Sequence, residues 1–332
     1  MDSRHLRAVA ISLLVGGLFL YLSFRNVPLA EVGAALRHVD WRWLGAALIV
    51  SVLIQVFRAW RWQLELRPLT HVPLGRLWVV TSVSYMTINL LPMRLGEFVR
   101  PWLLSRRAPV TFSNVVGNLV IEKTMDSVVI LFYILVGLIT TTDLPLWVRR
   151  GAAFPAALAG LLVTLVVLLW WRGESFVDRW IVARLPARFG EGLKRVLTAL
   201  LDGMRILPDP RLLLLVFLVS LALWFLPILS SYIMIQAFRL PIPFSAAVIV
   251  FIFIGFGTAL PNAPGMIGTF QYACVLALAL FGVAKAEALA YGLILNAIQL
   301  FTLVAQGMVA LPLAGVSLED LVRARREVPS AS

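Results

Sequence analysis

The stretch "NLLPMRLGEFVRPW", residues 89–102, interrupts what would otherwise be a membrane-spanning helix. Its first proline removes a backbone donor and clashes with the preceding turn, and its glycine permits conformations that a helix does not use. Arg94, Glu97 and Arg100 place three charges directly after this break. A charge inside the hydrocarbon costs on the order of 3 kcal/mol, so intramembrane charges usually face a cavity or a partner. The break is therefore a candidate functional segment.

The composition of the whole chain is that of a membrane protein. Of its 332 residues, 61% are hydrophobic and only 14% are charged. The apolar runs are continuous, whereas the strands of a membrane β-barrel would alternate polar and apolar residues. Runs of about 17–25 apolar residues are long enough to cross a bilayer as helices. Six segments are predicted to be full spans: about 8–24, 42–60, 111–141, 152–171, 211–237 and 288–313.

Two further apolar stretches are broken in the middle. One covers about 76–105, and the other covers 244–282 and is interrupted at "ALPNAPGMIG". Backbone groups freed from a helix at membrane depth must be buried in protein or line a watery cavity. Each broken stretch is thus either a re-entrant hairpin or a discontinuous helix.

The distribution of basic residues favours two hairpins. The net charge is +12, and the basic residues gather in the short links between apolar runs. If the N-terminus is cytoplasmic and both broken stretches return to their own side, the inner links carry 17 Lys/Arg residues and the outer links carry 7. Arg58 and Arg61 belong to this inner count, in a link predicted at 58–76. The bias follows the positive-inside rule and places both termini in the cytoplasm. It also argues against nucleic acid as a partner.

The predicted fold is an all-α integral membrane protein with six full spans and two re-entrant helical hairpins in two halves of opposite topology. Interrupted helices at matching positions of inverted halves are a pointer to the substrate site of a transporter. The link between the first two spans of the second half is either an amphipathic surface helix or a solvated connector. The predicted parts are a first half at 1–150 with an inner-side hairpin at 76–105, a second half at 151–318 with an outer-side hairpin at 244–282 and the link at 172–210, and a cytoplasmic tail at 319–332.

Polar residues follow one face of the span after the first break. Asn114, Asn118, Glu122 and Asp126 recur every four residues, and Lys123 lies beside them. This spacing keeps the four side chains on one side of a helix. Together with the charges of the break, they are predicted to form a polar cavity in which Arg94 or Arg100 grips a phosphate group. The alternatives are that Arg100 snorkels to the surface and that the carboxylates form an internal network that joins helices.

The second break offers fewer charges. Its backbone amides near Gly265 and Gly268 are predicted to be bare and able to attract an anion. Asn296 and Gln299 lie on one face of the last span, for which ordinary interhelical hydrogen bonds are the alternative. The candidate substrate-binding residues of this half are Pro261, Asn262, Pro264, Gly265, Gly268, Gln271, Asn296 and Gln299.

The remaining reactive residue types indicate no metal or cofactor. The three histidines are scattered in links, and the one cysteine, Cys274, lies in an apolar run. Tryptophans at predicted span ends are interpreted as interfacial anchors. They include Trp41, Trp43, Trp60, Trp62, Trp78 and Trp102.

The segments "LPMRLGEFVRPWLL", "IEKTMD" and "PNAPGMIGTFQ", in that order, resemble the signature segments of the lysylphosphatidylglycerol synthase transmembrane-region family, a flippase-like domain. The resemblance covers nearly the whole chain and implies inverted halves, re-entrant helices and the handling of lipids or lipid-linked precursors. The sequence departs from the pattern at Gln271, where the resemblance implies a glutamate, so no proton-coupling role is implied there. The residues that take the motif positions are Arg94, Gly96, Glu97, Glu122, Asp126, Pro264, Gly265 and Gly268.

The expected function is movement of an anionic lipid, or of a polyprenyl-phosphate-linked precursor, between the leaflets of a bacterial-type inner membrane. The alternatives are an integral-membrane enzyme or accessory protein acting on a lipid phosphate, and a scaffold for lipid-synthesis enzymes. An enzyme is not expected, because the sequence has no D-x-D motif, no histidine in a span and no nucleophile beside a base. Membrane lipids are the expected partners.

Overall fold

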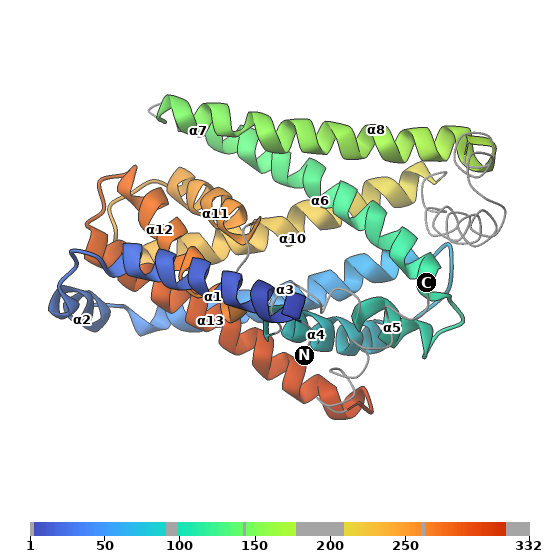
Figure 1. The fold of residues 1–332 in the computed structure, drawn as a ribbon, viewed down its shortest axis with the longest axis horizontal. Helices are drawn as coiled ribbons and strands as arrows, with labels where there is room; N and C mark the ends of the chain where they lie inside the picture. The colour runs from blue at the N-terminus through green and yellow to red at the C-terminus, as the bar shows by residue number, and fades with distance from the viewer. Residues whose placement is uncertain (1–2, 91–98, 142–143, 177–208, 260–262, 317–332) are drawn as a thin grey trace.

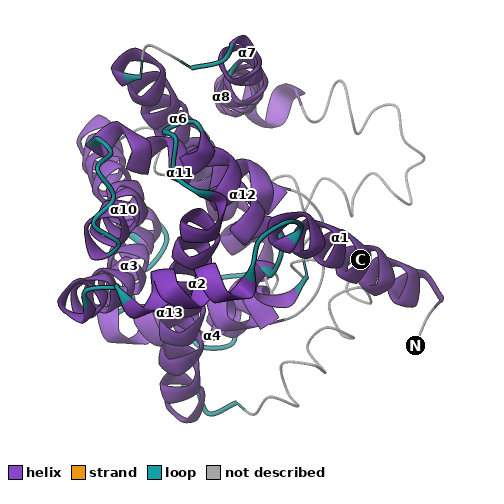
Figure 2. Ribbon diagram, turned by 90° about the vertical axis from the view of Figure 1, so that its left-hand side faces the viewer, coloured by secondary structure: helices purple, strands orange, loops and turns teal. Residues whose placement is uncertain are grey.

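The computed structural model describes residues 3–90, 99–141, 144–176, 209–259 and 263–316, and every regular element in these ranges is helical (Figures 1 and 2). The helices are α1 Ser3–Phe24, α2 Leu29–Arg37, α3 Trp41–Leu66, α4 Leu74–Leu90, α5 Val99–Ser105, α6 Phe112–Thr140, α7 Leu146–Gly151, α8 Ala153–Phe176, α10 Pro210–Ala237, α11 Phe244–Ala259, the 3₁₀ turn η4 Pro264–Met266, α12 Thr269–Ala279 and α13 Lys285–Leu313.

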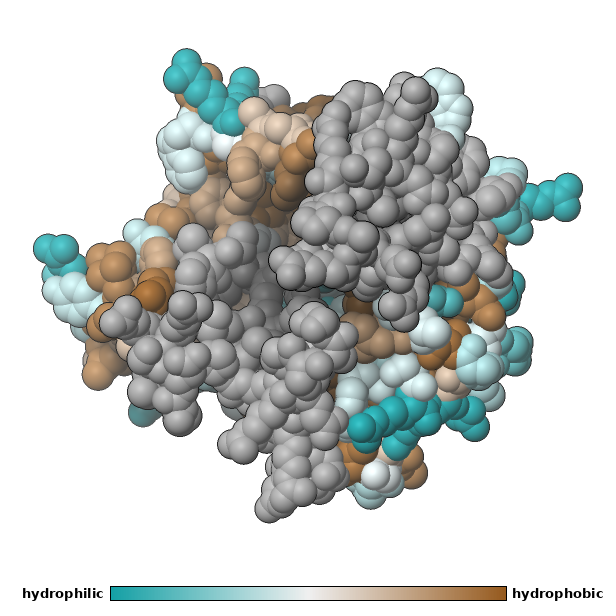
Figure 3. All heavy atoms as spheres, turned by 45° about the vertical axis from the view of Figure 1, so that its right-hand side comes forward, coloured by the Kyte–Doolittle hydropathy of each residue, from teal (hydrophilic) through white to brown (hydrophobic). Residues whose placement is uncertain are grey.

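Several of these helices are long and apolar enough to cross a membrane. Among the described residues, four helical segments are long and apolar enough to span a bilayer: Trp41–Leu66, Leu146–Leu168, Pro210–Ala237 and Lys285–Leu313. A fifth candidate is the pair α1 and α2, which is bent by 81°. Large apolar side chains on the outside, such as Leu14 at 72% and Phe301 at 67% exposed, need lipid around them. Figure 3 shows such apolar side chains (brown) gathered on one face. The protein is therefore a multi-pass membrane protein.

The six predicted spans each correspond to a helix: α1, α3, α6, α8, α10 and α13. Three of them begin at a capping side chain, as short polar residues before an apolar run predict. Asp40 accepts from the Arg42 amide, Thr111 from the Asn114 amide, and Asp209 from the amides of the first turn of α10.

One boundary was predicted wrongly. The second span does not end near residue 60, because α3 continues to Leu66. Arg58 and Arg61 are therefore helix residues and not part of a cytoplasmic link, and Arg61 is only 2% exposed. The helix can carry Arg61 because carboxylates inside the protein pair with it, and the Arg58 guanidinium is hydrogen-bonded to Gln55 and stacked on the Tyr85 ring.

Each stretch that was predicted to be broken holds more than one helix. The first holds α4 and α5, and the second holds α11, η4 and α12, where Gly265 and Gly268 have φ of 70° and 94°. Residues 91–98 and 260–262 lie outside the described residues, as do most of the 172–210 link and the 319–332 tail. The return of each stretch to its own side of the membrane, and the inverted topology, stay predictions. α4 packs directly against η4, so parts of the two broken stretches are neighbours.

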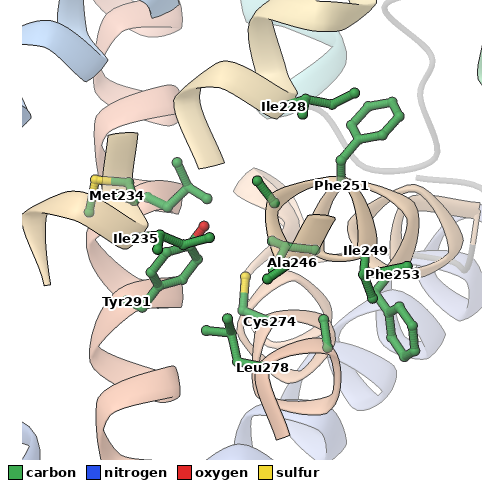
Figure 4. Packing of buried hydrophobic residues seen from close by; sticks show 14 of the residues in the cluster. Ile228, Met234, Ile235, Ala246, Ile249, Phe251, Phe253, Cys274, Leu278 and Tyr291 are labelled. Atoms are coloured by element: carbon green, nitrogen blue, oxygen red, sulfur yellow. The ribbon is translucent and has the colours of Figure 1, made fainter. Parts of the chain in front are cut away.

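The largest apolar core joins the second half to α3 and α6. Figure 4 shows Ile228, Met234 and Ile235 of α10 packed with side chains of α11, α12 and α13, including Tyr291, whose hydroxyl donates to the Ser231 carbonyl at 2.8 Å. Because lipid tails are as apolar as these side chains, close packing and interhelical hydrogen bonds hold the helices together. α3 lies along α10, and α6 lies between α8 and α11 (Figure 1).

Candidate functional site

Arg61 is the centre of a buried ion network near the end of α3. Its guanidinium is 2.9 Å from the Glu122 carboxylate on α6 and donates a short hydrogen bond to Asp126, also on α6. Glu65, one turn along α3, approaches the same guanidinium at 3.5 Å. A guanidinium presents five donors in a planar fork, which suits several carboxylates at once. Arg61 thus ties α3 to α6 by charge.

A second arginine completes the network from α5. Arg100 donates to Glu122 at 2.6 Å, so this carboxylate bridges two guanidinium groups. The Arg100 guanidinium also lies over the ring of Trp62, 3.8 Å from its centre. A cation over a desolvated tryptophan face gains electrostatic attraction. Arg100 is 4% exposed, and its position links the first broken stretch to α3 and α6.

Neutral side chains close the network on both sides. Asn118 accepts from the Trp62 indole at 3.1 Å and donates to the Glu65 carbonyl at 3.2 Å. The Trp224 indole of α10 donates to Asp126 at 2.7 Å. These bonds satisfy polar groups that would otherwise be costly at membrane depth. The polar stripe Asn118, Glu122 and Asp126 is confirmed to face one side, the side of α3 and α10.

Some of the predicted site residues have other positions than expected. Arg100 does not snorkel to the surface, because Glu122 and Trp62 hold it inside. Lys123 is exposed and lies off the stripe. Trp62 is fully buried and is not an interfacial anchor, unlike Trp41, which is 73% exposed. The predicted residues Arg94, Gly96, Glu97, Pro261 and Asn262 lie outside the described residues.

Sequence reasoning missed Arg61 and Glu65 as members of the site. Both were placed in a link because they follow the apolar run of the second span. A usable signal was present: Arg58, Arg61 and Glu65 are spaced by three and four residues, which puts them on one face of a helix.

The second half holds a smaller, neutral network. Gln271 on α12 accepts from the Gly268 amide at 2.7 Å and donates to Asn296 on α13 at 3.2 Å. Asn296 in turn donates to the Gly265 carbonyl at 3.1 Å. The Gly268 amide was predicted to be bare, and this prediction is wrong, because the Gln271 side chain caps it. A glutamine suits this place, since it must both accept and donate.

Three predicted members of the second half lie at the margin of this network. Pro264 opens η4 and is exposed, and Gly265 is buried beside it with φ of 70°. Gln299 is half-buried, and the hydrogen bonds between Gln271 and Asn296 do not include it. Within the described ranges no group of three or more His, Cys, Asp or Glu side chains is placed to hold a metal ion.

The bridge between Arg100 and Glu122 is expected to contribute strongly to stability. We expect Arg100→Met and Glu122→Gln each to lower the free energy of unfolding, and the double variant to lose less than the sum, with a coupling of about 0.5–3 kcal/mol. Thermal unfolding in detergent measures this cycle. The matched control pairs Arg100→Met with Glu31→Gln, on the exposed part of α2, where the effects should add. Additive effects in the Arg100 and Glu122 cycle would contradict the bridge.

The fold and the site together define a class: a multi-pass helical membrane protein with a buried charge network between its helices. The family model described as "Lysylphosphatidylglycerol synthase TM region" matches residues 9–307, and the chain belongs to this family. Two relatives, each described as "UPF0104 membrane protein" from Methanothermobacter thermautotrophicus, are similar to it. One is 22% identical over 94% of this chain and 97% of its own length. The other is 24% identical over 75% of this chain and 76% of its own length.

Proposed function

We propose that this protein moves an anionic lipid, or a polyprenyl-phosphate-linked precursor, between the leaflets of a bacterial-type inner (plasma) membrane. The carrying observation is the ion network of Arg61, Arg100, Glu122 and Asp126 inside the helix bundle. Charges at membrane depth are retained where a protein must handle charge there. A lipid whose headgroup bears a phosphate needs such a place to cross, while its tails stay in the hydrocarbon.

The contact between the two broken stretches supports a shared substrate path. α4, which leads into the first break, packs against η4 in the second. In transporters with inverted repeats, the substrate site lies where such interrupted helices meet. Arg94 and Glu97 in the first break, and Pro261 and Asn262 in the second, are proposed to line this path.

The packing of the helices supports the inverted-repeat arrangement. The helices α3, α4, α5 and α6 can be matched, in this order, with α10, α11, α12 and α13. Most contacts between helices then have a counterpart: the contact of α4 with α13 corresponds to that of α11 with α6, and the contact of α5 with α6 to that of α12 with α13. α1 and α8 depart from this rule, because α1 packs on α12 while α8 packs on α6. On this arrangement both termini are cytoplasmic, the halves cover 1–150 and 151–318, and each hairpin gates one side.

The proposed activity is transport without chemical conversion. Membrane lipids with a phosphate headgroup are the proposed substrates, and lipid-synthesis enzymes are potential protein partners. Mass spectrometry of lipid extracts before and after incubation with the purified protein should show the same lipid species. A new lipid product would favour an enzyme acting on the lipid phosphate.

Leaflet exchange in proteoliposomes tests the proposal directly. Fluorescent phosphatidylglycerol, polyprenyl phosphate or phosphatidylcholine is placed in both leaflets, and a membrane-impermeant quencher reports the fraction that reaches the outside. We expect the protein to accelerate exchange of at least one of the two anionic lipids over protein-free liposomes, and over phosphatidylcholine. Exchange of both anionic lipids at the protein-free rate would refute the proposal.

A further inference from the structure

The arginines of α3 differ in their pairing. Arg61 is held by Glu65, Glu122 and Asp126. Arg58, one turn earlier on the same membrane-spanning helix, has no carboxylate of the described residues within ion-pairing distance. An unpaired arginine charge within a span is energetically unfavourable, so an anionic ligand that paired with it would be stabilised there.

The described residues around Arg58 orient its guanidinium without neutralising its charge. One of its terminal nitrogens donates to the Gln55 side-chain oxygen at 2.7 Å. The guanidinium lies over the Tyr85 ring of α4, 3.9 Å from the ring centre. Stacking and one neutral hydrogen bond fix the plane of the fork. The residue is half-buried, and its guanidinium has further donors beyond the one that Gln55 accepts.

Gln55 adds a second unsatisfied donor at the same place. Its side chain is 2% exposed, and its amide nitrogen has no hydrogen-bond partner among the described residues. Because the amide oxygen is engaged by Arg58, the NH₂ group of the same amide lies next to the guanidinium. A buried donor without an acceptor is unfavourable, and an incoming acceptor would remove this cost.

We propose that Arg58 and Gln55, with Tyr85 beneath the guanidinium, form a binding site for a phosphate group at membrane depth. The proposal rests on the proposed function and names the residues that hold the headgroup of the transported lipid. A phosphate offers several acceptor oxygens to the guanidinium fork and to the Gln55 amide. Arg61 and Arg100 would first have to give up carboxylate partners, whereas Arg58 binds without breaking an ion pair.

The neutrality of Gln55 is essential to this site. A glutamate there would supply the missing counter-charge and pair with Arg58, which would close the site to anions. Gln55→Glu therefore tests the proposal without removing any side-chain volume. Arg58→Met removes the charge and keeps much of the stem. Arg67→Met is the matched control, because Arg67 is an exposed arginine at the end of the same helix.

The experiment measures lipid binding to the purified full-length protein in neutral detergent by native mass spectrometry, with phosphatidylglycerol and diacylglycerol as probes. We expect Arg58→Met and Gln55→Glu each to weaken phosphatidylglycerol binding about 10-fold or more, since a lost bond to a charged group has this effect. Diacylglycerol binding and the Arg67→Met variant should not change. Unchanged phosphatidylglycerol binding in Gln55→Glu, or an equal loss for diacylglycerol, would overturn the site.

Two further measurements complete the test. One distinguishes a free phosphate ion from a lipid headgroup as the ligand, and the other distinguishes failure of the binding site from failure of the transport function. Competition by inorganic phosphate supports a site for the phosphate group alone, and Arg58-dependent binding without competition supports a site for the lipid headgroup. If the wild type binds phosphatidylglycerol through Arg58 but does not move it in liposomes, the transport function fails and the site stands. If both variants transport and bind as the wild type does, the site fails and the function stands.

Discussion

Replacement of Arg61 by methionine is expected to lower the free energy of unfolding by about 3–5 kcal/mol, the usual cost of breaking a buried ion pair by removal of one partner. The loss should be severe because Arg61 is 2% exposed and contacts Glu65, Glu122 and Asp126. Without it, the ion pair that remains among the described residues is that of Arg100 with Glu122, and Glu65 and Asp126 have none. The measurement is unfolding in detergent, by heat or by titration with a denaturing detergent.

Arg67→Met is the control for this prediction, since it removes the same charge from an exposed position at the end of α3. A surface substitution of this kind changes stability by no more than about 0.5 kcal/mol. In the Arg61→Met background, Glu65→Gln and Asp126→Asn should restore part of the loss, because they remove carboxylate charges that Arg61 no longer neutralises. Equal stability of Arg61→Met and Arg67→Met would contradict the central role of Arg61.

Replacement of Gly268 by alanine is the second change with a large expected effect, a loss of about 3 kcal/mol or more. Gly268 has φ of 94°, a conformation that costs a side-chain-bearing residue about 1–3 kcal/mol. A Cβ atom there would lie 2.0 Å from the Gly16 carbonyl oxygen of α1. The clash must push α1 away from the second break, and overpacking of this kind adds about 1–3 kcal/mol.

The matched control is Gly17→Ala, next to Gly16 on α1. Apart from the adjoining residues and backbone of α1 itself, no atom of the described residues lies within 4 Å of a Cβ placed there, and alanine favours a helix over glycine by about 1 kcal/mol. Gly17→Ala should thus keep or raise the unfolding temperature, whereas Gly268→Ala should lower it. If Gly268→Ala unfolds at the wild-type temperature, α1 does not pack on the second break as described.

Local sequence features predicted the helices well. Continuous apolar runs predicted the six long helices of the described residues, and proline and glycine predicted the interruption between α11 and α12, because these residues act on the backbone within one or two turns. The first predicted break, at 91–98, lies outside the described residues. The four-residue spacing from Asn118 to Asp126 likewise predicted a single polar face on α6. The prediction that this polar face meets the charges after the first break is confirmed for one pair, since Glu122 is 2.6 Å from Arg100.

The partners of those polar residues could not be predicted in the same way. Glu122 was expected to meet the arginines of the first break, yet Arg61 is its second partner, and Arg61 is 65 residues from Asp126 in the chain. Trp224, which donates to Asp126, comes from the other half, 98 residues away. Such pairs depend on how α3, α6 and α10 pack, and no local pattern encodes this packing.

Arg61 and Arg67 illustrate the division between the two sources of information. In the sequence both follow an apolar run, and both resemble cytoplasmic cations. The apolar run is enough to predict a helix, and the charges after it predict that the helix ends nearby. Tertiary packing decided the rest: α6 and α10 lie against one side of α3, so Arg61 is buried among carboxylates and Arg67 stays exposed. Helix formation depends on neighbours along the chain, whereas the role of a charged side chain depends on the helix that packs against it.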